Sequence, residues 1–184
     1  SGIVKNKGLQ LTTTDTVSVY ASNFLTTSFD ASFVPPTESL RDEYMIQTYK
    51  TKTADRPSEI LIVAIEDSTV VDIFPTAGTV NISNGTNSFS RVLNAGQTLQ
   101  LQSVANGDYS GTRVKSHDCK PIAVFNAHLC AYVPDNTGSS CDHLFEQCLP
   151  IVYWGTEFVA TMSNHHNGDI IKVTALEDNC QVWK

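Results

Sequence analysis

The sequence has few charges, no cluster of basic residues and no long apolar run. Only 17% of its 184 residues are charged, and 12 basic against 19 acidic residues give a net charge of -7. A protein that binds a phosphate backbone needs a basic patch, so this composition argues against a nucleic-acid partner. The longest uninterrupted aliphatic run is Ile60–Ile65, far below the roughly 20 residues that cross a bilayer. We therefore expect no membrane span.

Cysteine is absent from the first part of the chain, and all five cysteines lie between positions 119 and 180. A starting methionine is absent as well, and no charged segment followed by an apolar one opens the sequence. We therefore expect a mature protein or an excised fragment. The hydrophobic fraction of 41% is sufficient for a packed core and argues against a disordered chain.

A helical period of apolar residues is also missing. The apolar residues alternate with polar ones or form short β-branched runs, as in Thr16–Tyr20, Ile60–Ile65, Val70–Phe74, Thr98–Leu101, Ile122–Phe125 and Ile170–Val173. Such runs are typical of strands. Asn-Gly pairs begin at positions 84, 106 and 167, and these pairs favour tight hairpin turns. The sequence predicts an antiparallel all-β fold of the sandwich type.

Several segments of the chain resemble one another in the same order. The matched pairs are Gly2–Lys5 with Gly111–Lys115, Val17–Asn23 with Ile122–His128, Pro36–Tyr44 with Pro150–Phe158, and Glu59–Asp67 with Asp169–Asp178. The offset drifts by one position within the last pair, because Glu59 matches Asp169 whereas Glu66 matches Glu177. The pattern indicates a duplication, in which Tyr153 and Trp154 take the core position of Leu40.

We therefore predict tandem related antiparallel β-sandwich units, one over residues 1–110 and a second, incomplete one over residues 111–184. The second unit either borrows strands from the start of the chain or continues beyond residue 184. An unpaired strand edge would otherwise invite aggregation.

One stretch of the chain carries a specific combination of motifs. It contains Lys120-Pro-Ile-Ala-Val-Phe125, His128-Leu-Cys130, Cys141-Asp-His143 continuing through Glu146-Gln147 to Pro150, and Trp154-Gly155. With these motifs the sequence resembles the N-terminal domain of the IgGFc-binding protein family, over nearly the whole chain. The resemblance implies a secreted, extracellular protein of mucus or adhesive surfaces that binds and does not catalyse. It does not carry over immunoglobulin binding, and Cys119, Cys148 and Cys180 are not part of the family pattern.

His128, Cys130, Cys141 and His143 form the densest group of reactive side chains. Two histidines and two cysteines could hold a tetrahedral zinc ion. The alternative is a disulfide between Cys130 and Cys141, with the histidines as neighbours. Disulfides belong to extracellular β domains, so the family resemblance favours the bridge. Unit one has Asn23 and Leu25 at the corresponding positions and needs neither.

The remaining cysteines leave their pairing open. Cys119 with Cys180 is one candidate for a second disulfide, and Cys148 could pair with either of them or with a partner chain. An odd number of cysteines leaves one thiol unpaired within the chain. This thiol indicates an intermolecular bond, a partner residue outside the fragment, or a buried free thiol.

No residue is expected to be catalytic. Cys141, His143 and Glu146 are close in sequence, but no strand-to-helix nucleophile elbow accompanies them. The acidic pairs Glu66-Asp67 and Glu177-Asp178 offer too few oxygens for calcium and are interpreted as ordinary turns. We predict no cofactor.

Asn81-Ile-Ser83 and Asn84-Gly-Thr86 are acceptor sequences for N-glycosylation. The long loop Ser28–Pro36 and its counterpart Ala131–Phe145 are the predicted partner surface, because binding residues gather on loops. The first hypothesis is thus a non-catalytic adhesive module that binds an extracellular protein or a mucin-like or matrix glycan and associates with other units of its parent protein. The second is a zinc-dependent module built on His128, Cys130, Cys141 and His143.

Overall fold

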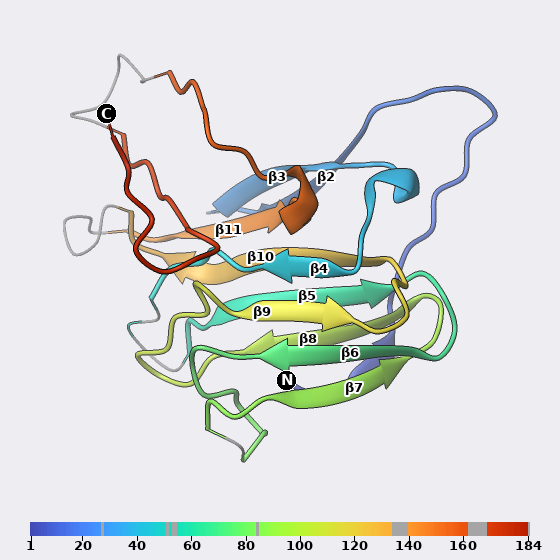
Figure 1. Ribbon diagram of the computed structural model, residues 1–184, viewed down its shortest axis with the longest axis horizontal. Helices are drawn as coiled ribbons and strands as arrows, with labels where there is room; N and C mark the ends of the chain where they lie inside the picture. The colour runs from blue at the N-terminus through green and yellow to red at the C-terminus, as the bar shows by residue number, and fades with distance from the viewer. Residues whose placement is uncertain are drawn as a thin grey trace.

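The computed structural model describes residues 1–26, 28–50, 52, 55–83, 85–133, 140–161 and 169–183. These residues form an all-β structure of three antiparallel sheets with two short 3-10 turns (Figure 1). The five-stranded sheet has the order β1(Val4–Asn6), β8(Gln97–Gln102), β5(Ser58–Ala64), β10(Ile122–Ala131), β11(Asp142–Gln147). The four-stranded sheet has the order β4(Glu43–Met45), β9(Arg113–Ser116), β6(Thr69–Phe74), β7(Phe89–Leu93). The third sheet is the hairpin β2(Val19–Leu25) and β3(Ser28–Val34). The all-β prediction and the sandwich-like packing are confirmed.

The core lies between the five-stranded and the four-stranded sheet. Alternate residues of β5 point inward, because successive side chains of a strand face opposite sides. Ile60, Ile62 and Ala64 are fully buried. They form one cluster with Ile122, Val124, Val71, Ile73, Val114, Leu99 and Leu101. Burying each large side chain of this kind contributes about 1.5–3 kcal/mol, so this cluster is the main source of stability.

Two buried tyrosines complete the core. The hydroxyl of Tyr44 on β4 donates to the carbonyl oxygen of Ile122 on β10 at 2.7 Å. The hydroxyl of Tyr109 lies 2.8 Å from that of Thr79. Burial raises the pKa of each tyrosine to about 12. Both phenols therefore stay neutral and act as hydrogen-bonding links between packed elements.

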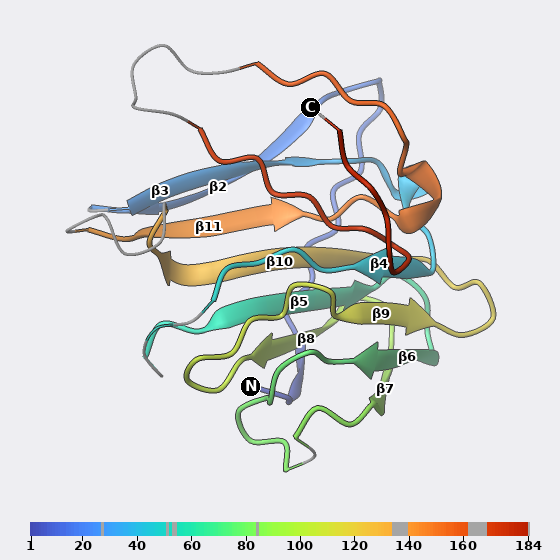
Figure 2. The same cartoon turned by 60° about the vertical axis from the view of Figure 1, so that its left-hand side comes forward.

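The sandwich combines strands from both sides of the predicted boundary at residue 110. β9 pairs with β4 and β6, and β10 pairs with β5. The hairpin β2–β3 does not join either large sheet and lies next to β11 at one end of the stack (Figures 1 and 2). Strands β2 and β3 thus lie outside the sandwich, whereas β9, β10 and β11, which follow residue 110, lie inside it.

The hairpins β2–β3 and β10–β11 have the same register. Four consecutive cross-strand pairs of β2–β3, from Tyr20↔Phe33 to Asn23↔Asp30, correspond to four of β10–β11, from Phe125↔Gln147 to His128↔Leu144. On the first strand of each hairpin, the residues that correspond in this register are also the residues that the sequence match pairs, since Val17–Asn23 resembles Ile122–His128. On the second strand, corresponding residues such as Phe33 and Gln147 have the same spacing in sequence as the matched prolines Pro36 and Pro150.

A matching 3-10 turn follows each hairpin. η1(Thr37–Ser39) and η2(Ile151–Tyr153) both begin after a proline and end at an extended residue. The N–H of Leu40 donates to the carbonyl of Thr37 at 3.1 Å, and the N–H of Trp154 donates to that of Ile151 at 3.0 Å. The same sequence pattern therefore produces the same local backbone twice.

Two predictions fail in the second half of the chain. The run Ile170–Val173 is not a strand, because no neighbouring strand among the described residues supplies hydrogen-bond partners for its backbone. Leu40 is buried, whereas Trp154 is half-buried and Tyr153 is exposed. These aromatic residues therefore do not enter a core as predicted.

Candidate binding surface

The hairpin β2–β3 exposes four aromatic side chains on one face. These are Tyr20, Phe24, Phe29 and Phe33, with exposed fractions between 49% and 77%; we call them the aromatic face. They form two cross-strand pairs in edge-to-face geometry. The ring centroids of Tyr20 and Phe33 are 5.6 Å apart, and those of Phe24 and Phe29 are 6.4 Å apart. Pairs of this kind fix the ring positions, so the aromatic face is a preformed apolar surface.

The opposite face of the hairpin carries the polar side chains Ser28, Asp30 and Ser32 of β3 and packs against β11 through them. The N–H groups of His143, Phe145 and Gln147 lie on the outer edge of β11. They donate to Ser28 Oγ at 3.0 Å, Asp30 Oδ2 at 2.6 Å and Ser32 Oγ at 2.9 Å, respectively. Side chains at every second position of β3 thus replace the backbone ladder and cover an edge that would otherwise be open.

This orientation reverses the usual arrangement of an amphipathic hairpin, in which the apolar face is inside. The hydrogen bonds to β11 fix the polar face inward, and the alternation of the strands then directs the aromatic face outward. An exposed apolar patch of this kind is typical of an interaction site. Because of this orientation, we take the aromatic face as the candidate binding surface.

The structure changes the description of the predicted partner surface, whose role stays a prediction. Ser28–Val34 is a strand and not a loop, and the exposed phenylalanines lie on the face of a hairpin. Its counterpart, Ala131–Phe145, contains the end of β10 and the start of β11, while residues 134–139 lie outside the described residues. The two segments are brought together by the packing of β3 on β11.

A shallow hollow lies between the hairpin and β11. It has a volume of about 320 Å³ and is lined by Ala21, Ser22, Asn23, Phe24 and Phe145. Phe145 stacks on Phe125 with ring centroids 5.0 Å apart. The hollow adjoins the aromatic face at Phe24.

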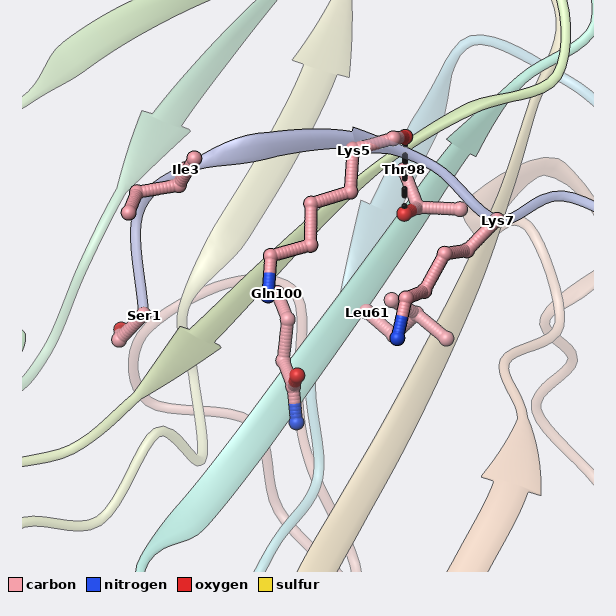
Figure 3. A pocket seen from close by; sticks show the side chains of 7 residues that line it. All are labelled: Ser1, Ile3, Lys5, Lys7, Leu61, Thr98 and Gln100. Atoms are coloured by element: carbon pink, nitrogen blue, oxygen red, sulfur yellow. Dashed lines mark hydrogen bonds between the residues drawn. The ribbon is translucent and has the colours of Figure 1, made fainter.

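A second hollow lies on the outer side of the five-stranded sheet. Figure 3 shows it under the first residues of the chain, where the side chains of Lys5 and Lys7 extend over Leu61 and Gln100. Its volume is also about 320 Å³. Thr98 donates to the carbonyl of Lys5 at 3.2 Å and holds this segment against the sheet.

Cys130 and Cys141 are joined by a disulfide, with Cα atoms 5.1 Å apart. The bridge ties the end of β10 to the start of β11 and uses the two thiolates that the zinc hypothesis needs. In the described part of the chain no three His, Cys, Asp or Glu side chains are grouped as metal ligands. Of the two interpretations of this motif, the structure contains the disulfide.

His128 is buried beside the bridge. Its Nδ1 atom accepts the N–H of Cys130 at 3.1 Å, and its buried Nε2 atom has no partner among the described residues. Burial lowers the pKa of His128, and the nearby backbone of Lys50 and the Asp108 carboxylate partly offset this effect. The imidazole is therefore a neutral part of the interior.

Sequence reasoning missed a basic and aromatic cluster beside the same bridge. Arg56 Nη1 donates to the hydroxyl of Tyr132 at 2.6 Å and lies 3.2 Å from Cys141 Sγ. The amino group of Lys52 lies 4.1 Å from the centroid of the Tyr132 ring, a cation–π geometry. These residues are widely separated in sequence and carry no common motif, so no signal could have indicated their contact.

The other three cysteines are free in the structure, including Cys119 and Cys180, the candidate pair for a second disulfide. Both are exposed. Cys119 lies in the turn between β9 and β10, where Asp118 and Cys119 both have positive φ, and Cys180 lies in the C-terminal segment. Cys148 is buried, its thiol donates to Asn126 Oδ1 at 2.8 Å, and burial raises its pKa to about 12. Cys148 therefore fits one of the three explanations given above for an unpaired cysteine, a buried free thiol.

The remaining predicted sites lie at the other end of the molecule or in simple turns. Asn81 is exposed at positive φ in the connection between β6 and β7, which lies far from the hairpin in both views (Figures 1 and 2). Asn84 lies outside the described residues. Asp67 Oδ1 accepts the N–H of Ala95 at 3.0 Å, which links the turn between β5 and β6 to the turn between β7 and β8. No helix in the described part is long and apolar enough to cross a membrane.

Comparisons with known proteins place these observations in a family context. The family model described as IgGFc binding protein matches residues 30–184. A curated protein from Homo sapiens named IgGFc-binding protein is 29% identical over 164 residues, which is 86% of this chain. The chain spans only 3% of the length of that relative. No solved structure matches the chain.

Proposed function

Because this chain belongs to the IgGFc-binding protein family, we propose that it is a non-catalytic extracellular module that binds a protein partner through the aromatic face. The observation that carries the proposal is the outward orientation of Tyr20, Phe24, Phe29 and Phe33. Aromatic residues dominate the energetically important centres of protein interfaces. In this chain they lie on a hairpin whose polar side is already occupied by β11.

An extracellular location is supported by the disulfide and by the acceptor sequences for N-glycosylation. Disulfides persist in oxidising compartments. A glycan on Asn81 would lie at the end of the molecule opposite the hairpin (Figure 1), so it would leave the aromatic face accessible. Cys141 is part of the bridge and is not available as a nucleophile, which supports binding without catalysis.

The name of the human relative suggests the first probe. We propose to measure binding of the full chain to immobilised human IgG Fc and, in parallel, to purified mucin, since a glycan partner belongs to the same hypothesis. The test variant is Phe24→Ser with Phe33→Ser. Loss of two central aromatic anchors is expected to weaken binding at least tenfold, because each hot-spot residue contributes about 2 kcal/mol or more.

Phe74→Ser is the matched control. Phe74 is also an exposed strand phenylalanine, with 45% of its surface accessible, but it lies on β6 and not on the hairpin. The control is expected to bind like the wild type. Equal binding by the double variant and the wild type to every probe that the wild type binds would contradict the proposed surface.

A further inference from the structure

β2 has an unpaired edge, although its counterpart β10 has none. β10 pairs with β11 on one side and with β5 on the other. β2 pairs with β3 on one side, and on its other side no strand is found among the described residues. Because the two hairpins have the same register, β2 corresponds to β10 and β3 to β11. The free edge of β2 therefore corresponds to the edge of β10 that pairs with β5.

The sequence counterpart of β5 lies elsewhere and exposes its apolar side chains. Glu59–Asp67, which contains most of β5, resembles Asp169–Asp178. Ile60 and Ile62 are fully buried on β5, whereas Ile171 and Val173 have exposed fractions of 62% and 61%. A segment with strand-forming side chains and an open strand edge are thus present in the same chain.

We propose that the free edge of β2 is a docking site for residues 169–177 of the same chain, which add to the hairpin as an antiparallel strand. The equivalent pairs in the sandwich give the register. Val124↔Ile62 corresponds to Val19↔Val173, Asn126↔Ile60 to Ala21↔Ile171, and Ile122↔Ala64 to Val17↔Ala175. In each of the three pairs an apolar side chain lies opposite another, on one face of the extended hairpin.

The proposed register is one of two that the sequence match allows, because the match drifts by one position. It aligns the buried β5 positions Ile60, Ile62 and Ala64 with three apolar residues of the segment. The other register would place Lys172 opposite Val19, and a threonine opposite Val17. A shift by one residue transfers every side chain to the other face, so the apolar pattern selects a single register.

In the structure the segment is hydrogen-bonded to the rest of the chain through Lys172 and Thr174. The amino group of Lys172 donates to the carbonyl of Thr48 and to Ser110 Oγ, the latter at 2.9 Å. Thr174 Oγ1 accepts a hydrogen bond from Gln47 Nε2 at 2.9 Å. In this position Ile171, Val173 and Ala175 remain exposed, and docking on β2 would replace these contacts. Addition of the segment as an edge strand would supply hydrogen-bond partners for the backbone of the segment and for the backbone at the free edge of β2.

Engineered disulfides test the docking and its register. In the full chain with Cys119→Ser and Cys180→Ser, the pair Val19→Cys with Val173→Cys is oxidised mildly and mapped by mass spectrometry. The proposal predicts an intrachain bond in the monomer at a yield at least tenfold above that of Val19→Cys with Lys172→Cys, which reports the alternative register. Cys148 remains in place because it is buried.

A third pair, Gln47→Cys with Thr174→Cys, reports the position that the segment occupies in the structure. Bond formation by this pair together with none by Val19→Cys/Val173→Cys would overturn the proposal. A bond found only between two chains would overturn it as well, because the occupant would then be a second copy. Native hydrogen-exchange protection of β5 and β10 in each variant shows that the sandwich is folded, so a missing bond cannot be attributed to misfolding.

Discussion

The three free cysteines differ in their access to solvent, and this difference decides their chemistry. Only the thiolate of a cysteine is nucleophilic, and burial in apolar surroundings disfavours it. The pKa of the Cys148 thiol is raised to about 12 by burial, whereas Cys119 and Cys180 are exposed. An intermolecular bond of this protein would therefore involve Cys119 or Cys180 and not Cys148.

Native thiol labelling tests this assignment. We expect a maleimide reagent at pH 7.5 to modify Cys119 and Cys180 within minutes and Cys148 only after denaturation, as read by peptide mass spectrometry. The disulfide cysteines serve as the internal control, because they should react only after reduction. Rapid labelling of Cys148 in the folded chain would show that its environment is open.

His128 should make the stability of the fold depend on pH. Burial lowers its pKa in the folded state below the unfolded value of about 6.5. As the pH falls below that value, the unfolded state binds a proton first. The contribution of His128 is therefore complete above about pH 6.5 and is lost as the pH falls toward its folded pKa, with a slope of at most about 1.4 kcal/mol per pH unit.

Denaturant titrations between pH 7.5 and pH 5 of the wild type and of His128→Asn measure this effect. Asparagine is the residue that β2 has at the corresponding position, Asn23. The free energy of unfolding of the wild type should fall over this range, and that of the variant should change less. Parallel curves for the two proteins would exclude His128 as the source of the dependence.

At the scale of single residues, the sequence was sufficient to identify the cysteine and histidine motif but not the residues that contact it. The spacing and the family resemblance placed Cys130, Cys141, His128 and His143 together. The contact of Arg56 with Tyr132 and Cys141 depends on how a distant loop folds back. Long-range contacts of this kind leave no local pattern in a single sequence.

Among the elements, the hairpin β2–β3 depends on its polar contacts with β11. Asp30 Oδ2 accepts the N–H of Phe145, and Asp30 Oδ1 accepts that of Ala31. Asp30→Ala would leave the Phe145 amide without its partner, which typically costs about 1–3 kcal/mol.

Hydrogen exchange followed by mass spectrometry can resolve this effect. We expect Asp30→Ala to raise the exchange rate of peptides that cover β3 and β11, while peptides that cover β5 and β6 remain protected. Ser22→Ala, on the exposed side of the same hairpin, is the matched control and should leave both pairs unchanged. Equal exchange in β11 for the two variants would mean that side-chain bonds from β3 do not hold this edge.

The disulfide restricts a short loop between β10 and β11. Cys130 and Cys141 are separated by 11 residues in sequence, and closing a loop of this size stabilises a protein by about 3 kcal/mol in the chain-entropy model. We expect Cys130→Ser with Cys141→Ser to lower the free energy of unfolding by about that amount. Denaturant titration measures it, with the reduced wild type as a second estimate.

The same titration repeated with added zinc separates the two interpretations of the motif. A disulfide at this position predicts no effect of zinc on the oxidised wild type. Zinc that stabilised the reduced wild type to the level of the oxidised protein, and not the double serine variant, would support the thiolate site.

Strands were predictable where both neighbours are present. Val70–Phe74 and Thr98–Leu101 are strands with paired edges, and their alternation is a sufficient signal. Ile170–Val173 is also rich in β-branched residues, but no strand lies beside it among the described residues. Its β propensity alone is therefore not sufficient to form a strand. Strand formation requires a partner, and a partner is a property of the whole fold.

For the whole molecule, the sequence indicated an all-β fold and matched segments, but not which strands pair. The sandwich joins β5 to β10 and β4 to β9 across residue 110. The division into units over residues 1–110 and 111–184 therefore describes the repeated sequence segments and stays a prediction for the structure. If residues 169–177 dock on β2 as proposed, each predicted unit would receive a strand from the other.

The aromatic face of the hairpin is the proposed binding surface for a protein partner, and site-specific photo-crosslinking tests this proposal most directly. A benzophenone amino acid is placed at Phe24 in one variant and at Phe74 in the other, and both are irradiated in mucus extract. Binding through the aromatic face predicts a discrete covalent protein adduct from position 24 and none from position 74. Equal adducts from the two positions, or an adduct from position 74 alone, would contradict it.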